Sequence, residues 1–291
     1  MRTKDTLQRF LFEQHPIRGS LVRLDSTFRA ARDCHAYPLA MAHFLGEALA
    51  ASALLSASIK HHESLILQVQ ADGPVRLIVA QCTGERSLRG LVRWTGSVNS
   101  EILADACRNG LLVITIDPGE GQERYQGMVQ LAGSSLAQAI ESYFVQSEQL
   151  RTRLWLAADD RSAAGLFLQR VPGGDPADPD AWRRVQKLGS TITSRELLEL
   201  PNYDLLHRLF HEEDLRVFES EVVTFRCRCS RARIARVLYS LGRSELEAVL
   251  HQEGNVSVTC EFCNRTYAFD AVDVGQLFVE GVQPQVPPTP Q

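Results

Sequence analysis

Two close pairs of cysteines near the C-terminus constrain the fold of this chain more than any other feature. Cys227 and Cys229 form one pair, Cys260 and Cys263 form the other, and 30 residues lie between them. Residues i and i+2 of an extended segment point the same way, and a C-x-x-C turn after a strand also brings two sulfurs together. Four converging thiolates make a closed tetrahedral site that suits one Zn²⁺ ion and leaves no position for a catalytic water. The pattern predicts a structural or switching zinc site.

The segment around these cysteines, residues 221–280, is expected to be a small zinc-binding module. Its pattern predicts strands over 222–225 and 256–259 and helices over 230–241 and 244–251. A module of about 60 residues buries little apolar surface, and structural zinc contributes roughly 10–16 kcal/mol of apparent binding free energy. We therefore expect removal of the metal to unfold it. Five arginines lie close to the first pair in the sequence: 226, 228, 231, 233 and 236. They either favour the thiolate form of the cysteines or form a solvated helix face, and the two interpretations have equal weight.

Residues 1–175 are predicted to form a mixed α+β domain. Strand patterns occur in runs with helices inserted between them, which favours α+β over an alternating parallel α/β fold. A helix is expected from Ser135 to about Glu148. The Ala-rich stretch from Leu39 to Ile59 is long enough to check against a membrane, but it carries His43 and Glu47, so it is interpreted as a core helix. The expected strands cover 64–70, 75–80, 88–94, 111–116, 124–131, 150–157 and 165–171.

A turn-rich loop over residues 172–180 marks the expected end of this domain, and residues 176–220 are predicted to be a helical linker. Thr193 and Glu196 have the spacing of a capping box, and Asn202 is expected to cap the next helix. That helix carries an apolar face, which is expected to pack on the first domain in the resting state: Leu205, Leu206, Leu209 and Phe210. Residues 281–291 contain four prolines and are predicted to be a disordered tail.

Composition and motifs exclude several functional classes. The chain has 31 basic and 35 acidic residues, which argues against a protein that covers nucleic acid or an anionic membrane with its whole surface. The first residues lack the apolar run of a secretory signal, so a cytosolic protein is expected, with thiols used for metal or redox chemistry. No phosphate-binding loop and no serine elbow of the G-x-S-x-G type is present, and no enzymatic activity is expected.

Other candidate sites are weaker. His207 and His211 share a helix face but lack the Glu of a metalloprotease motif, so a second metal site is disfavoured. Cys34, Cys82 and Cys107 are expected to be ordinary core thiols. For the four paired cysteines three interpretations stay open: a static zinc ribbon, a nucleic-acid-binding zinc module or a redox switch. The arginines and acids of residues 221–281 nearly balance, 7 − 8 = −1, which weakens phosphate binding. A thiol–disulfide oxidoreductase ranks below these, because the C-x-x-C follows a strand.

The chain resembles the heat-shock protein 33 family of redox-regulated holdase chaperones. The resemblance runs from about Arg9 to Asp273, and its most specific part is residues 225–231, Leu241-Gly242 and 260–263, followed by Tyr267, Phe269 and Asp270. Matching stretches in the first domain are 35–38, 45–47, 125–127 and 147–150. Ala71 and Ala232 depart from the family pattern, but neither lies at the cysteines.

The resemblance implies a function and a switch. The reduced form holds zinc in four thiolates and is a weak chaperone. Peroxide with heat, or hypochlorous acid, forms disulfides Cys227–Cys229 and Cys260–Cys263 and releases the metal, although four cysteines alone allow three pairings. The zinc module and linker then unfold, and the protein forms a homodimer. It holds unfolding clients without ATP and later passes them to an ATP-dependent foldase system. If the module stops bracing the linker, Leu205, Leu209 and Phe210 are expected to become available to clients.

Overall fold

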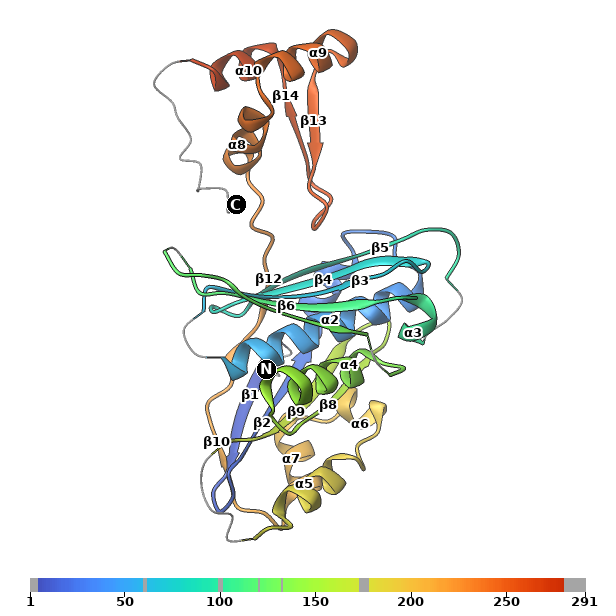
Figure 1. Ribbon diagram of the computed structural model, residues 1–291, viewed down its shortest axis with the longest axis vertical. Coiled ribbons are helices and arrows are strands. Elements are labelled where there is room, and N and C mark those ends of the chain that lie inside the picture. The colour runs from blue at the N-terminus through green and yellow to red at the C-terminus, as the bar shows by residue number, and fades with distance from the viewer. Residues whose placement is uncertain are drawn as a thin grey trace. The chain divides into compact units, whose positions relative to one another are not determined.

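The computed structural model describes residues 5–59, 62–98, 102–119, 121–131, 133–172 and 178–279. The chain divides into two compact units, Met1–Arg226 and Cys227–Gln291 (Figure 1). The expected tail at 281–291 and the expected domain end at residue 175 lie outside the described residues. Each unit is described by itself.

Two six-stranded sheets form the frame of the first unit. The first sheet has the order β10 (Leu215–Val217), β1 (Thr6–Phe12), β2 (Ile17–Leu24), β9 (Ala163–Arg170), β8 (Thr152–Ala158), and β11 (Glu221–Val222) also pairs with β1. The second sheet has the order β12 (Thr224–Phe225), β5 (Ser87–Trp94), β4 (Val75–Thr83), β3 (Ser64–Gln70), β6 (Leu111–Asp117), β7 (Tyr125–Gln130). Neighbouring strands are antiparallel, except that β12 runs parallel to β5. The fold is the α+β class that the sequence predicts, although the strands β1 and β2 were not among those expected.

A central helix, α2 (Leu39–Ser58), packs between the two sheets (Figure 1). By length and composition α2 could cross a membrane, but 83% of its apolar window is buried inside the unit. The core helix predicted from the sequence is therefore confirmed. The second sheet packs against α2 through one buried face, as β3 illustrates. In β3 this face consists of Leu65, Leu67 and Val69, which alternate with more exposed residues. The smaller elements are α1 (Ser26–Arg32), α3 (Leu103–Ala106), α4 (Leu136–Tyr143) and a π-helix, η1 (Phe144–Glu148).

The linker helices α5 (Ala181–Gly189), α6 (Ser194–Glu199) and α7 (Asn202–Phe210) pack on the other face of the first sheet. This sheet is buried on both sides, so β9 is apolar along almost its whole length: Phe167 faces the α2 layer, whereas Leu166 and Leu168 face the linker. The capping box of Thr193 and Glu196 is confirmed. The predicted cap of α7 is wrong: Pro201 takes the cap position, and Asn202 is the first helical residue, with its side chain donating to Thr6 Oγ1.

The segment from Glu221 to Arg226 belongs to the first unit. β11 pairs with β1, and β12 pairs with β5. Between them Val223 is buried, and its backbone N–H donates to the Asp5 carbonyl. Glu221 receives ion pairs from Arg9 and Arg86. The second unit therefore begins at Cys227 and not at residue 221, because backbone pairing with both sheets holds the preceding segment.

The second unit consists of α8 (Arg231–Leu241), α9 (Arg243–Glu253), a hairpin of β13 (Val256–Thr259) and β14 (Thr266–Phe269), and α10 (Ala271–Leu277). Ser230 caps α8 by accepting a hydrogen bond from the Arg233 N–H. Among its described residues, the fully buried apolar core is small: Leu238, Leu246, Val256, Phe269 and Val274. A core of this size stabilises a fold only marginally, so a further cross-link would add much to the stability of this unit.

Candidate metal centre

The first cysteine pair lies on the extended segment that enters α8. Cys227 and Cys229 are two residues apart there, which puts both sulfurs on one side of the backbone. The backbone of Cys229 also hydrogen-bonds to the sulfur of Cys227. Ser230 then begins α8 and fixes the direction in which the chain leaves the pair. The local backbone thus presents two sulfurs to a single point.

The second pair lies in the turn of the β13–β14 hairpin. The Asn264 N–H donates to the Cys260 carbonyl, and the Cys260 N–H donates to the Arg265 carbonyl. Asn264 adopts a left-handed conformation, with φ at 55°, which closes the turn tightly. Cys260 and Cys263 are therefore presented by a rigid turn at one end of the hairpin.

The four sulfurs converge on one point. They all lie within 4.8 Å of one another, with 3.6 Å between the sulfurs of Cys227 and Cys260 and 3.3 Å between those of Cys229 and Cys263. Zn–S bonds of about 2.3 Å in a tetrahedron separate sulfurs by about 3.8 Å. Four soft thiolate donors at this spacing fit a Zn²⁺ ion, and the site has no position for a substrate. Among the described residues, this is the one group of three or more His, Cys, Asp or Glu side chains placed to hold a metal.

The thiols of this site differ in acidity. Burial raises the pKa of Cys229, but hydrogen bonds from Tyr267 and from the other cysteines have the larger effect. Together they lower this pKa from 9.0 to about 7. Burial raises the pKa of Cys227 and of Cys263. The hydroxyl of Tyr267 donates to the Cys229 sulfur at 3.2 Å. In the sequence, Tyr267 stands out only as part of a family motif. The pattern that indicates an inward side chain is its position two residues before Phe269, on the same side of β14.

Two of the arginines near the first pair have partners other than the thiols. Arg231 donates to the Ala268 carbonyl, pairs with Asp273 and lies over the ring of Phe269 at 4.2 Å. Arg233 donates to the Arg228 carbonyl. Arg265 does make electrostatic contact with the thiols of Cys263 and Cys229, and their charges raise its pKa after the larger effect of its hydrogen bond with Tyr267. For Arg231 and Arg233, a role in packing and capping fits better than a role in favouring thiolates.

The remaining candidates separate into buried and exposed groups. Cys82 and Cys107 are buried core thiols, as predicted, whereas Cys34 is only partly buried and donates to the Ala30 carbonyl. Its expected place in the core is wrong, because it follows the end of α1 in a surface turn. His207 and His211 lie on the exposed side of α7 with their rings stacked at 5.8 Å.

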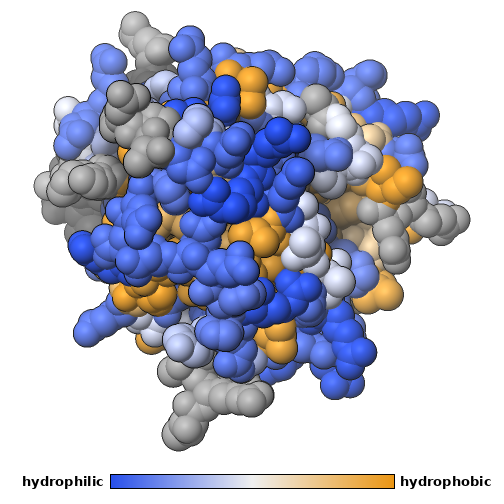
Figure 2. All heavy atoms as spheres, turned by 90° about the horizontal axis from the view of Figure 1, so that it is seen from below, coloured by the Kyte–Doolittle hydropathy of each residue, from blue (hydrophilic) through white to orange (hydrophobic). Residues whose placement is uncertain are grey.

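The apolar residues expected to bind clients are covered in this state. Leu205, Leu209 and Phe210 are each no more than 2% exposed, and they pack against Phe10, Phe12 and other residues of the first sheet. On the face shown in Figure 2, hydrophobic residues form only small patches among hydrophilic ones. The linker therefore hides a continuous apolar layer.

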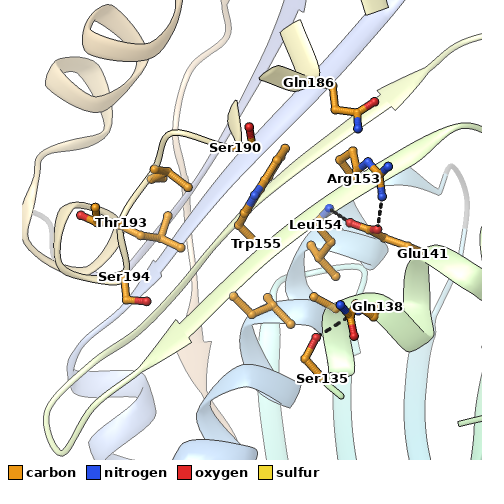
Figure 3. A pocket seen from close by; sticks show the side chains of 14 residues that line it. Ser135, Gln138, Glu141, Arg153, Leu154, Trp155, Gln186, Ser190, Thr193 and Ser194 are labelled. Atoms are coloured by element: carbon orange, nitrogen blue, oxygen red, sulfur yellow. Dashed lines mark hydrogen bonds and ion pairs between the residues drawn. The ribbon is translucent and has the colours of Figure 1, made fainter. Parts of the chain in front are cut away.

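A cavity of about 410 Å³ interrupts the packing between the linker and the rest of the first unit (Figure 3). On one side Glu141 of α4 pairs with Arg153 of β8 and accepts the N–H of Leu154. Trp155 lies in the middle of the lining, and Ser190 and Thr193 come from the linker. The linker is thus packed closely along α7 and less closely along this edge of the sheet.

Comparisons with known proteins agree with this geometry. The sequence profile of the Hsp33 protein family matches residues 5–270. A 33 kDa chaperonin of Nitrosococcus oceani is 52% identical over 289 residues, which is 99% of each chain. One from Methylobacillus flagellatus is 43% identical over 280 residues, 96% of each chain. The crystal structure of the 33 kDa chaperonin of Thermotoga maritima superimposes with a TM-score of 0.83 at 26% identity, covering 94% of this chain and 97% of that one.

Proposed function

Because the chain belongs to the Hsp33 family of chaperones, we propose that it is a redox-regulated holdase, a non-enzymatic chaperone that binds unfolding proteins without ATP. In the reduced state the four cysteines hold one Zn²⁺, the linker covers the first sheet and client binding is weak. Oxidative and heat stress in the cytoplasm converts it to the binding form. Membership of the family supports the chaperone activity, and the chemistry of the four cysteines supports the switch.

One observation carries the proposal: the groups placed to hold the metal are also the groups that oxidants attack. The four sulfurs converge within 4.8 Å in a unit with only a small apolar core. When bound, zinc supplies the folding free energy that this core lacks. Thiolates that become disulfides no longer bind the metal, so oxidation and unfolding of the unit are coupled by chemistry.

The proposed oxidation uses two molecules of peroxide. In each pair one thiolate attacks a peroxide oxygen, giving a sulfenic acid and hydroxide. The second thiolate then attacks the sulfenic sulfur, forms the disulfide and expels a second hydroxide. The two thiolates of each pair thus give two electrons to one peroxide, which becomes two waters after taking up two protons. We propose the pairs Cys227–Cys229 and Cys260–Cys263, because all four sulfurs lie within reach of one another in the folded unit but only neighbours in sequence stay close as it unfolds.

The proposed client surface is the apolar layer between the linker and the first sheet. Leu205, Leu209 and Phe210 would become available with the sheet residues beneath them once the linker separates. An apolar surface of this kind binds unfolded chains and also favours self-association, which supports a homodimer in the oxidised form. Clients would later pass to an ATP-dependent foldase system, since nothing in this mechanism folds them.

The test is light scattering of a heat-unfolded client without ATP. We expect the peroxide-treated protein, oxidised at elevated temperature, to suppress aggregation, and the reduced zinc-loaded protein to do so weakly. The variant with Cys227, Cys229, Cys260 and Cys263 all replaced by Ser tests whether the response to peroxide depends on these thiols. Suppression by neither form would contradict the proposal and would favour a nucleic-acid-binding zinc module, which retention on heparin would reveal.

A second variant tests the client surface. Leu205→Ser with Leu209→Ser should weaken holding by the oxidised protein, because it removes apolar surface from the exposed layer. Asp204→Ser, at an exposed position of the same helix, is the matched control. Undiminished holding by a folded double variant would show that clients bind elsewhere.

A further inference from the structure

We propose that Tyr267 is a positioning residue whose hydroxyl restrains Cys229. Through this restraint, Tyr267 sets how readily the four-cysteine site releases its metal when an oxidant attacks the thiolates. The proposal rests on the proposed redox function and adds a residue that controls its threshold. Its basis is the 3.2 Å hydrogen bond from the Tyr267 hydroxyl to the Cys229 sulfur.

The hairpin fixes the position of this hydroxyl. Tyr267 lies opposite Val258 in the β13–β14 register, and two residues later Phe269 is buried in the core of the unit. Arg265 hydrogen-bonds to the phenol of Tyr267. An arginine only donates, so it occupies the phenol oxygen and leaves the phenol hydrogen for the sulfur. The donor is therefore aimed at Cys229 by the strand and by its own neighbour.

A hydrogen bond to a thiolate has two effects on this site. It stabilises the negative charge that the metal-bound sulfur carries, and outer hydrogen-bond partners of this kind typically contribute 10- to 100-fold to metal affinity. It also engages a sulfur lone pair, which makes the thiolate a weaker nucleophile toward peroxide. Both effects act in the same direction, since tighter metal binding and slower attack each delay loss of the metal.

The restrained step is the attack of the Cys229 sulfur on a peroxide oxygen. The sulfur donates an electron pair, the O–O bond breaks and hydroxide leaves, which gives the sulfenic acid of Cys229. The Cys227 thiolate then displaces the second hydroxide and closes the disulfide. Without the Tyr267 donor the first of these steps should proceed faster, and the later steps should be unchanged.

Tyr267→Phe is the direct test in the full-length, zinc-loaded protein. We expect about tenfold weaker zinc affinity in chelator competition without oxidant. With peroxide, we expect zinc release to a chromophoric chelator to be several-fold faster than in the unsubstituted protein. Tyr239→Phe is the matched control, because Tyr239 lies in α8 of the same unit and stacks on Phe278 at 5.2 Å. Unchanged affinity and rate in Tyr267→Phe, or slower release, would overturn the proposal.

A graded variant separates hydrogen bonding from packing. Site-specific 3-fluorotyrosine at position 267 keeps the ring and strengthens the donor, so release should become slower than in the unsubstituted protein, whereas a purely structural role predicts no change. The two arms also separate this proposal from the redox function. If peroxide releases no zinc from any variant, the redox function fails, and the affinity measurement still decides the role of Tyr267.

Discussion

Gly189 at the end of α5 lies directly against the indole ring of Trp155 in β8: a Cβ at position 189 would stand 2.7 Å from the ring carbon Cη2. Any larger residue must push α5 away from the sheet. We expect Gly189→Ala to weaken linker docking by about 1–3 kcal/mol, the usual cost of overpacking, even though Ala favours helices. The reduced variant should show faster amide hydrogen exchange in α5 and α6 and more client holding.

Gly275→Ala is the control for this substitution. Gly275 also lies in a helix, α10, and a Cβ there would meet nothing within 4 Å. We expect no loss of stability from it. Equal exchange in the linker of Gly189→Ala and of the unsubstituted protein would show that α5 accommodates the methyl group without moving.

An ion pair joins the two ends of the linker. Arg184 of α5 contacts Glu213, which follows α7, at 2.6 Å, and Glu213 is 7% exposed. Among the described residues, Arg184→Ala would leave this buried carboxylate with the more distant His15, at 3.7 Å, as its ion-pair partner, and we expect a loss of about 1–3 kcal/mol. Arg195→Ala breaks the exposed pair with Glu199 and should cost less than about 1 kcal/mol. Urea unfolding followed by tryptophan fluorescence would compare them.

Removal of the metal should unfold the second unit and leave the first unit folded. Chelation under reducing conditions is expected to unfold α8, α9 and α10, because the apolar core of that unit holds few residues. The first unit keeps its own core around α2 and should remain folded. All three tryptophans of the chain, 94, 155 and 182, lie in this unit, so their fluorescence should change only as far as the linker loosens around Trp155 and Trp182, while helical circular dichroism falls. Simultaneous loss of both signals would show that the first unit needs the metal.

Glu47 gives the first unit a defined pH response. Burial in α2 raises the pKa of its carboxyl from 4.5 to about 7. Between these values the folded chain binds the proton more tightly than the unfolded chain, so the free energy of unfolding falls as the pH rises. Glu47→Gln should therefore be more stable than the unsubstituted protein at pH 8, by about 1–3 kcal/mol, and nearly equal to it below pH 4.5. Glu199→Gln, on the surface, should leave the pH profile unchanged.

The sequence alone predicts the convergence of four sulfurs, because the spacing of Cys227, Cys229, Cys260 and Cys263 reflects local backbone geometry. It also predicts α2 and most strands of the second sheet, where one face is buried and residues alternate as in β3. It is less informative for β1 and β2, which pack in a sheet covered on both faces and lack that alternation. The contact of Tyr267 with Cys229 depends on the register of a hairpin, and the attachment of residues 221–226 depends on pairing with strands more than 130 residues away. A sequence pattern within a short window indicates neither that contact nor that attachment.

The pairing of β10, β11 and β12 has a consequence for reversibility. The linker is joined to the first unit at both ends, by β9 before it and by these short strands after it. If α5, α6 and α7 leave the sheet while these strands stay paired, residues 171–214 become a tethered loop and not a free tail. The entropic cost of closing such a loop grows only with the logarithm of its length, and it is already met while both anchors hold. Re-covering the sheet is then an intramolecular event at high effective concentration, so the linker competes with bound client for the same surface.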